Sequence, residues 1–284
     1  MGKQSKTTKT TLGLALSGGG ARGLAHIGFL KVLEREHIHV DYLSGTSMGS
    51  VIAAAYARGM SIEDLEREAV NSTTTRNMIR MVSITPPMRG IVESDKLKSV
   101  LNHFIPEGVN FEDLRIPTAI AATDLIHSCS VTLNSGPVLL AVMASCAMPG
   151  IFPAVDCPPL RLVDGGVLNN LPVNLVRKLG AKRVIAIDAM AEMIGIRPQE
   201  EQFIGADLPF PIPGALRDLL WSSSMMVARI TQAQVETEKP DLYLRPPIPV
   251  EVSMFLGFRH AQAAIDAGER AAEEYLPQIR ALLE

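Results

Sequence analysis

The apolar residues at the start of the chain fall into short runs separated by glycines. Residues 11–17 form a continuous apolar run, which is typical of a strand buried on both faces. Residues 24–34 show helical spacing, 37–43 predict a second strand, and 51–58 predict a second helix that ends at Gly59. This order of strand, helix, strand and helix predicts a right-handed crossover and therefore a parallel sheet.

The rest of the chain continues the alternation of strands and helices. Further strands are predicted over residues 117–125, 128–133, 160–163, 183–188 and 242–244. Further helices are predicted from Ser61, from Ser94, over 137–146, from Pro172 to Gly180, over 216–234, and over 257–280 with an interruption at Pro277. Two segments, 71–90 and 203–214, have the weak periodicity or the Pro and Gly content of loops. The pattern as a whole predicts an α/β fold.

No repeat and no clear linker divides the sequence. We predict a flexible N-terminus over residues 1–10 and a single α/β domain over 11–284. Within that domain, the motifs that carry chemistry lie in a core over residues 12–190. Residues 191–284 are expected to form a helical cover that packs on the sheet rather than a second domain.

Composition narrows the class of protein. The chain has 284 residues, of which 47% are hydrophobic, and its 27 basic and 30 acidic residues give a net charge of −3. This balance does not indicate nucleic-acid binding. The three cysteines lack the C-x-x-C spacing of zinc sites and are odd in number, and no apolar run reaches the ~20 residues of a membrane-spanning helix. We therefore expect a cytoplasmic protein with neither a disulfide framework nor a metal site.

One pentapeptide has the spacing of a catalytic serine. Gly45-Thr-Ser47-Met-Gly49 fits G-x-S-x-G and lies between a predicted strand and a predicted helix. A serine on such a sharp turn projects its hydroxyl outward, and the glycines let neighbouring backbone pass closely. The N-terminus of the following helix directs its dipole at the serine. A non-catalytic serine in a turn between two glycines fits the same pattern. The assignment of Ser47 as a catalytic residue therefore needs support from the rest of the chain.

A glycine loop from Gly18 to Gly23 follows the first strand directly. Its G-x-G-x-x-G spacing is also a dinucleotide fingerprint, and Asp41 lies near the distance expected for the acidic ribose ligand. Alternatively, free N–H groups of the loop, together with Arg22, form an oxyanion hole. Because this loop and the Ser47 turn both emerge at the carboxyl ends of adjacent parallel strands, the geometry favours the oxyanion hole. A P-loop is excluded, since no Gly-Lys-Ser/Thr follows.

A serine nucleophile needs a proton acceptor, and Asp164 is the best candidate. It ends a short apolar strand, and Gly165 and Gly166 after it let the backbone turn and present the carboxylate at the same sheet edge. Partial burial would raise its basicity. His260, the only histidine after Asp164, lies in a predicted helix, and structural or exposed roles are expected for all six histidines. The alternative for Asp-Gly-Gly is a simple turn.

Taken in order, these three motifs resemble the patatin-like phospholipase family, and residues 144–153 resemble its Ala- and Pro-rich block. The similarity covers about residues 12–188 and is to the compact bacterial, single-domain members. It implies a three-layer α/β/α sandwich with a mainly parallel central sheet, a modified α/β-hydrolase-type fold. Carried over residue by residue, it implies the following roles: Ser47 as nucleophile, Asp164 as base without a histidine, Gly18, Gly19, Gly20 and Arg22 as the oxyanion hole, and Gly23, Gly45, Gly49, Gly165 and Gly166 as supporting residues. Ser17 stands where many members carry Asp.

The resemblance implies a serine acyl hydrolase that cleaves lipid carboxylic esters without a cofactor. Two alternatives of another class stay open: a dinucleotide- or anion-binding regulatory protein on a Rossmann-like sheet, and a binding protein with an idle dyad. Trp221, Met225, Met226 and residues 203–213 are candidates for an apolar cover that contacts the membrane peripherally, although core packing also explains Trp and Met. No pattern in the sequence indicates the oligomeric state.

Overall fold

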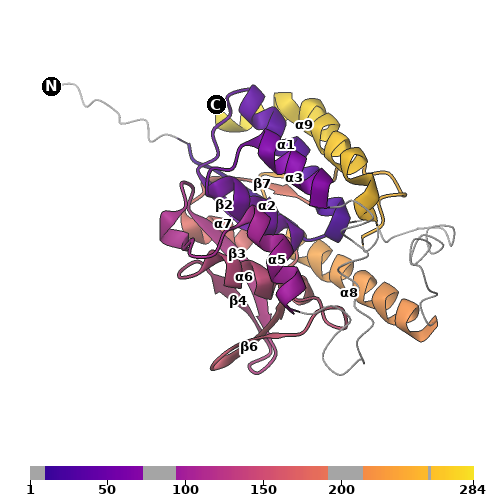
Figure 1. The fold of residues 1–284 in the computed structure, drawn as a ribbon. Helices are drawn as coiled ribbons and strands as arrows, with labels where there is room; N and C mark the ends of the chain where they lie inside the picture. The colour runs from indigo at the N-terminus through magenta and orange to yellow at the C-terminus, as the bar shows by residue number, and fades with distance from the viewer. Residues whose placement is uncertain (1–9, 73–93, 191–213, 255–256) are drawn as a thin grey trace.

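One mixed β-sheet runs through the protein (Figure 1). The structure, a computed structural model, describes residues 10–72, 94–190, 214–254 and 257–284. Within these residues eight strands lie in the order β5-β6-β3-β2-β1-β7-β8, with β4 paired to β3. The strands are β1 (Leu12–Leu16), β2 (Tyr42–Gly45), β3 (Thr118–Asp124), β4 (Cys129–Leu133), β5 (Val155–Cys157), β6 (Leu160–Asp164), β7 (Arg183–Ile187) and β8 (Leu242–Leu244).

The sheet has a parallel half and an antiparallel half. All four pairings among β3, β2, β1, β7 and β8 are parallel. The pairings of β3 with β4, of β3 with β6 and of β5 with β6 are antiparallel. The predicted parallel sheet is therefore present, and the chain between β3 and α7 adds an antiparallel extension to it.

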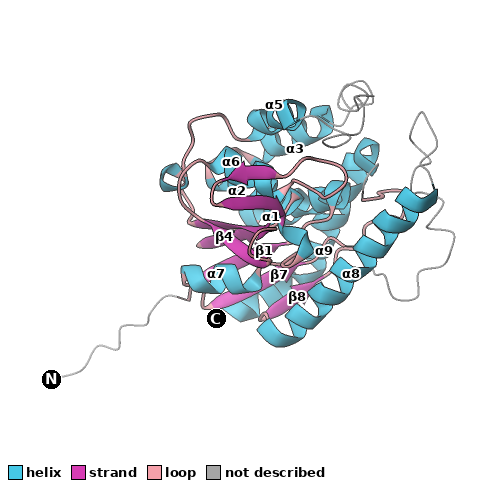
Figure 2. Cartoon of the chain, turned by 90° about the horizontal axis from the view of Figure 1, so that it is seen from below, coloured by secondary structure: helices cyan, strands magenta, loops and turns pink. Residues whose placement is uncertain are grey.

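Helices cover both faces of the sheet, which gives the three-layer α/β/α arrangement (Figure 2). The larger layer contains α1 (Ala25–Arg35), α2 (Met48–Ala57), α3 (Ile62–Ser72), α5 (Ser94–Phe104), α6 (Val138–Ser145) and α9 (Ala261–Leu283). The smaller layer contains α7 (Val173–Leu179) and α8 (Gly214–Glu238). Short 3-10 helices lie at η1 (Gly20–Leu24), η2 (Phe111–Asp113), η3 (Gly165–Val167) and η5 (Gly257–His260).

The central strand β1 shows why its sequence is apolar throughout. Leu12, Leu14 and Leu16 belong to the cluster formed with the larger helical layer, whereas Ala15 belongs to the cluster on the α7 side. All five residues of β1 are buried. Burying both faces of a strand removes apolar surface from water on both sides, at roughly 25 cal/mol per Å². The continuous apolar run is thus the sequence pattern of a strand between two layers.

The register of β3 brings two distant strand ends together. On one edge, β3 pairs with β2, whose last residue Gly45 lies opposite Ile120. β4 occupies the other edge of β3, opposite residues 120–124. β6 must therefore share the β2 edge, where its last residue, Asp164, lies opposite Ala122. The ends of β2 and β6 thus approach each other head-on along one edge of β3.

The C-terminal part of the described chain is built into the sheet and the larger layer. β8 pairs with β7, and α9 packs on α1 almost backbone to backbone. A Cβ on Gly28 would lie 1.9 Å from the carbonyl oxygen of Ile265, and a Cβ on Gly268 would lie 1.8 Å from that of Ala25. Only glycine allows the two helices to approach this closely.

The structure differs from the sequence predictions at α9 and β5. The final helix is not interrupted at Pro277, because α9 continues to Leu283 and the fully buried Ile279 anchors its last turns. The short strand β5 was missed, since three residues give too little periodicity. Almost all of the predicted loop over 71–90, the predicted cover over 203–213, and residues 1–9 of the predicted flexible terminus lie outside the described residues.

Candidate active site

Ser47 occupies the turn between β2 and α2 in an unusual backbone conformation. Its φ is 50° and its ψ is −124°, a region that non-glycine residues rarely adopt. The surrounding backbone leaves no space for side chains. A Cβ on Gly45 would lie 2.4 Å from the carbonyl oxygen of Gly49, and a Cβ on Gly49 would lie 2.5 Å from that of Ser17. The structure therefore contains the strand-to-helix turn that G-x-S-x-G predicted.

A second serine holds this turn in place. The N–H of Ser47 donates to the Oγ of Ser145 at 2.8 Å, and Ser145 is a fully buried residue at the end of α6. The hydroxyl of Ser50 donates to the carbonyl of Ser47. Sequence reasoning noted the block over 144–153 but assigned Ser145 no role. No local sequence pattern could indicate this role, because α6 lies next to Ser47 only as a result of tertiary packing.

The glycine loop runs directly past Ser47. A Cβ on Gly18 would lie 3.2 Å from the Cβ of Ser47, so the two segments are in contact. The N–H of Gly18 is already engaged, since it donates to the carbonyl of Asn170 at 3.1 Å. Within the described part of the chain, the N–H groups of Gly19 and Gly20 donate to no acceptor. The loop therefore presents two open amides, at Gly19 and Gly20, and not three.

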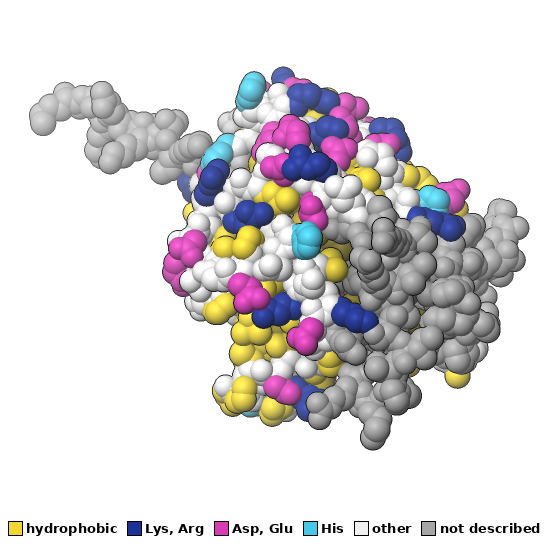
Figure 3. Space-filling view, viewed as in Figure 1, with side chains coloured by type: hydrophobic (Ala, Val, Ile, Leu, Met, Phe, Trp, Pro, Cys, Tyr) yellow, Lys and Arg dark blue, Asp and Glu magenta, His cyan; other side chains and the backbone are white. Residues whose placement is uncertain are grey.

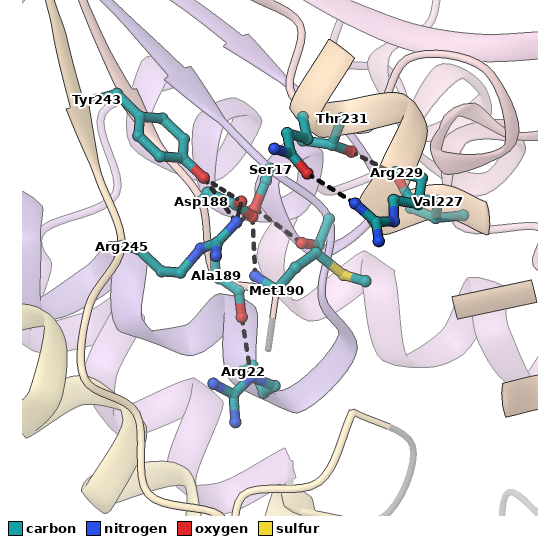
Figure 4. Close-up of polar contacts among 12 residues, drawn as sticks. Ser17, Arg22, Asp188, Ala189, Met190, Val227, Arg229, Thr231, Tyr243 and Arg245 are labelled. Carbon is teal, nitrogen blue, oxygen red and sulfur yellow. Dashed lines mark hydrogen bonds and ion pairs between the residues drawn. The ribbon is translucent and has the colours of Figure 1, made fainter. Parts of the chain in front are cut away.

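The guanidinium of Arg22 donates to backbone carbonyls of the chain after β7. Its Nε donates to the carbonyl of Ala189 at 2.9 Å, and one terminal nitrogen donates to the carbonyl of Val252 at 3.2 Å. The N–H of Ala189 in turn donates to the Oγ of Ser17 at 2.8 Å (Figure 4). Arg22 and Ser17 thus hold Ala189 from both sides. The guanidinium ties the glycine loop to the chain after β7, and we assign it that structural role.

The neighbouring residue Asp188 extends the hydrogen bonds around Ala189 to β8. It is 1% exposed and accepts hydrogen bonds from the hydroxyl of Tyr243 and from Arg245, both at 2.8 Å (Figure 4). The N–H of Met190 donates to its other oxygen at 3.0 Å. A buried carboxylate needs such partners. These bonds join the ends of β7 and β8 beneath the glycine loop, so Asp188 is a structural residue of the loop's support.

Asp164 reaches the Ser47 turn from an antiparallel strand. β6 runs antiparallel to β3, so Asp164 arrives at the end of β2 rather than beside it. Its carboxylate is 4% exposed, and one oxygen accepts the N–H of Gly166 at 2.7 Å. Burial raises the pKa of Asp164 to about 6, while the Gly166 N–H and the Ser47 hydroxyl act in the opposite sense. The other carboxylate oxygen is buried without a hydrogen bond of normal geometry.

The surroundings of this pair contain a thiol and no histidine. The desolvated Cys146 at the end of α6 interacts with the hydroxyls of Ser50 and Ser47 and with the charge of Asp164; burial and then that charge raise the pKa of the thiol. All six histidines lie in the described part of the chain, and none of them hydrogen-bonds Ser47 or Asp164. The polar side-chain groups of the site are therefore a half-buried hydroxyl, a buried carboxylate and a neutral, half-buried thiol.

His26 is the histidine nearest in sequence to the glycine loop, and it supports that loop. It is fully buried in α1, and its Nε2 lies 2.9 Å from the carbonyl oxygen of Ser17. Burial lowers the pKa of His26 to about 4, against the weaker opposing effects of Ser17 and Asp188. A neutral ring that donates from Nε2 satisfies the Ser17 carbonyl, which is the structural role predicted for it.

The dinucleotide alternative fails on the position of Asp41. The residue lies just before β2, at the amino end of that strand, and its carboxylate accepts the N–H of Leu12 at 2.8 Å. A ribose ligand has to stand at the carboxyl end of the second strand. The Asp41 carboxylate therefore lies at the wrong end of β2 for a ribose ligand. It is also engaged in a hydrogen bond that links the start of β1 to the segment before β2.

Comparison with known proteins agrees with this arrangement of motifs. The sequence profile described as patatin-like phospholipase matches residues 14–177, which contain the glycine loop, the Ser47 turn and Asp164. This chain belongs to the patatin-like phospholipase family. The matched residues extend from β1 into α7, so the family region covers the parallel strands β1, β2 and β3 together with the antiparallel extension.

Three relatives illustrate the range of the family. The mouse patatin-like phospholipase domain-containing protein 6 is 36% identical over 186 residues, covering 64% of this chain and 14% of that protein. The Drosophila melanogaster neuropathy target esterase sws is 30% identical over 264 residues, covering 85% of this chain and 18% of that protein. An uncharacterised NTE family protein of Mycobacterium bovis is 31% identical over 194 residues, covering 68% of this chain and 53% of that protein. The chain thus spans about a seventh of the first relative and about half of the bacterial one.

Proposed function

We propose that this patatin-like protein is a serine acyl hydrolase that cleaves lipid carboxylic esters, in the manner of a phospholipase A or an esterase. The observation that carries the proposal is the head-on approach of β2 and β6 along one edge of β3, which supports a site shared by Ser47 and Asp164. The printed names of two relatives, which include phospholipase and esterase, support the same chemistry.

In the proposed reaction, Ser47 is the nucleophile and Asp164 is the general base. The carboxylate takes the hydroxyl proton while Oγ forms a bond to the ester carbonyl carbon. When the tetrahedral intermediate collapses, the bond to the leaving alcohol breaks, and Asp164 returns the proton to that alcohol. A water molecule then attacks the acyl-enzyme by the same route and releases the fatty acid. The raised pKa of about 6 makes Asp164 a better base than an exposed aspartate.

The open amides of the glycine loop supply the oxyanion hole in this proposal. The N–H groups of Gly19 and Gly20 lack acceptors, whereas the N–H of Gly18 and the guanidinium of Arg22 are engaged by backbone carbonyls. A donor aimed at the developing oxygen contributes roughly 3 kcal/mol to the transition state. We therefore assign the hole to Gly19 and Gly20, with Gly18 and Arg22 holding the loop in position.

A fluorophosphonate probe tests the nucleophile directly. The wild type should be labelled and should hydrolyse short acyl esters, while Ser47→Ala should do neither and Asp164→Asn should react far more slowly. Ser224→Ala is a matched control, because Ser224 is also a buried serine but its hydroxyl donates only to a carbonyl of its own helix. Equal labelling of wild type and Ser47→Ala would refute the assignment. Folded protein that binds lipid without turnover would favour the idle-dyad alternative.

We further propose that α8 contacts the lipid surface that presents the substrate. Leu219, Met225 and Met226 are 56%, 46% and 59% exposed, so the two methionines are not core residues, and Trp221 is half-buried. None of the helices in the described part of the chain is long and apolar enough to cross a membrane. Liposome flotation of Met226→Glu against wild type tests the contact, and equal flotation of the two would remove it.

Charge does not explain such a contact. On the face drawn in Figure 3, basic and acidic side chains intermingle over α1, α3 and α9. Lys31, for example, lies between Glu66 and Glu269, and Arg35 lies within reach of Glu269 and Glu273. The face formed by α1, α3 and α9 therefore carries no excess of positive charge that would favour anionic lipid, and flotation should depend on the apolar side chains of α8.

A further inference from the structure

Asn170 lies buried between the two loops that carry the proposed chemistry. It follows η3, the short helix that Asp164 caps, and is 3% exposed. Its backbone carbonyl accepts the N–H of Gly18 at 3.1 Å, which fixes the start of the glycine loop. Its side-chain nitrogen Nδ2 is buried and has no hydrogen-bond partner. An unpartnered buried amide is costly, so its presence at this junction requires an explanation.

The side-chain amide of Asn170 and the carboxylate of Asp164 both lie next to the empty Cβ position of Gly166. A Cβ on Gly166 would lie 3.0 Å from Oδ1 of Asp164 and 3.1 Å from Oδ1 of Asn170. The Asn170 amide also borders the glycine loop, since a Cβ on Gly18 would lie 2.5 Å from its Oδ1. Glycines at both positions therefore leave room for one amide group beside the carboxylate.

The two side chains have complementary unsatisfied groups. Oδ2 of Asp164 is buried without a hydrogen bond of normal geometry, although the Ser47 hydroxyl acts on the carboxylate, and Nδ2 of Asn170 is a buried donor without a partner. The terminal torsion of asparagine has a broad energy profile, so its amide can rotate without moving the backbone. Rotation by half a turn would exchange Oδ1 and Nδ2 and place the donor on the side of Gly166 and of Oδ1 of Asp164, a carboxylate oxygen that accepts the Gly166 N–H and has a second lone pair.

We propose that Asn170 is a positioning residue for Asp164, which holds the carboxylate with its side-chain amide while its backbone carbonyl holds the glycine loop. This inference rests on the proposed function, in which Asp164 alternately accepts and returns a proton. When the carboxylate is charged, an N–H of Asn170 stabilises it; when the carboxylate holds the proton, the amide oxygen faces it instead. The amide of Asn170 thus matches both protonation states of the base at one site.

Few other groups influence the charge of Asp164. The Gly166 N–H and the Ser47 hydroxyl favour the ionised form, and burial opposes it. From α6, the thiol of Cys146 is neutral because its own pKa is raised. No lysine, arginine or histidine in the described part of the chain forms an ion pair with Asp164. Removal of the neutral Asn170 amide should therefore produce a measurable change in the pKa of Asp164.

The chain offers a matched control in the preceding residue. Asn169 is also 3% exposed, but its Nδ2 donates to Oδ1 of Asn174 at 3.0 Å. Its backbone carbonyl accepts the hydroxyl of Thr46 at 2.8 Å, so it too fixes a loop of the site. Truncating Asn169 or Asn170 to alanine removes the same atoms from neighbouring positions. Only the Asn170 truncation removes the amide that faces Asp164.

The test is the titration of Asp164 followed by carbon-13 NMR of carboxyl-labelled aspartate. The Asp164 signal is identified by its loss in Asp164→Asn. The pKa of Asp164 should rise by roughly one unit in Asn170→Ala and stay near the wild-type value in Asn169→Ala. In Asn170→Asp, which keeps the shape of the side chain, the added charge should raise it at least as much. In the Asn170 variants, the acidic limb of the pH profile of esterase activity should move to higher pH by the same amount as the pKa of Asp164.

The outcomes separate this inference from the proposed function. If no ester is cleaved and Ser47 takes no probe, the proposed function fails, yet the NMR titration still reports on Asn170. An unchanged Asp164 pKa in both Asn170→Ala and Asn170→Asp would overturn the inference, and so would equal shifts in the alanine variants of Asn169 and Asn170. If Asn170→Ala does not fold, the isosteric Asn170→Asp decides the question.

Discussion

The backbone N–H of Ser47 and the hydroxyl of Ser145 are joined by a hydrogen bond of 2.8 Å between residues 98 positions apart in sequence. This bond satisfies an amide whose residue has a positive φ, and it anchors the proposed nucleophile to the end of α6. The strained turn is therefore held from outside its own motif. The position of the Ser47 side chain depends on how α6 packs as well as on the glycines next to it.

Ser145→Ala should loosen the proposed nucleophile. It leaves the Ser47 N–H without its acceptor in a mostly buried site, which costs about 1–3 kcal/mol of unfolding free energy. Displacement of the hydroxyl should lower the rate of fluorophosphonate labelling by roughly tenfold or more. Ser224→Ala is the control, since Ser224 is also buried but donates only to a carbonyl of its own helix. Equal labelling rates in the two variants would contradict this role.

Ester hydrolysis should gain activity as pH rises through about 6. The general base must be ionised before it accepts the Ser47 proton, and burial raises the pKa of Asp164 to about 6. The measurement is the pH profile of kcat/KM on a short acyl ester between pH 4 and 8. A profile that is flat from pH 4.5 upward would show that the carboxylate is not raised in pKa or is not the base.

His26 and Asp164 should make opposite contributions to the pH dependence of stability. The pKa of His26 is lowered from 6.5 to about 4, so between these values the unfolded chain binds more protons and stability rises with pH. The pKa of Asp164 is raised from 3.8 to about 6, so in that window the folded chain binds more protons and stability falls as pH rises. Each group corresponds to about 3 kcal/mol over its window. The wild type should therefore show little net slope from these two groups.

Single variants should reveal the two opposing slopes. In Asp164→Asn, the remaining His26 contribution should make the urea midpoint rise between pH 4 and 6.5. In His26→Gln, whose amide can still donate to the Ser17 carbonyl, the midpoint should fall between pH 4 and 6. Parallel pH profiles for the wild type and both variants would show that neither group is perturbed by burial.

Gly20→Ala should test how closely the glycine loop is packed. Gly20 has φ 55°, and a Cβ there would lie 2.0 Å from the carbonyl oxygen of Met254. Gly108 also has a positive φ, of 89°, but nothing lies within 4 Å of its Cβ position. Gly108→Ala should therefore cost only about 1 kcal/mol, for backbone strain alone. Gly20→Ala should lower Tm by clearly more and abolish probe labelling, and similar Tm values would contradict the close packing.

The sequence by itself was sufficient for the local parts of the site. The apolar run of β1 predicted a strand between two layers, and the glycine spacing around Ser47 predicted a turn that the structure contains. These features depend on a few neighbouring residues, because burial pattern and backbone sterics act over short distances in the chain. The family resemblance, which the sequence profile confirms, also rests on such contiguous motifs.

Only the tertiary structure decided how those parts meet. Asp164 ends an antiparallel strand that meets the end of β2, and the sequence pattern carried no information on the direction of that strand. Two nitrogens of Arg22 donate to the carbonyls of Ala189 and Val252, and the partner of the Ser47 amide comes from α6. Strand direction, register and long-range hydrogen bonds depend on which surfaces pack together. A linear pattern records the chemical type of each residue but not its partner in space.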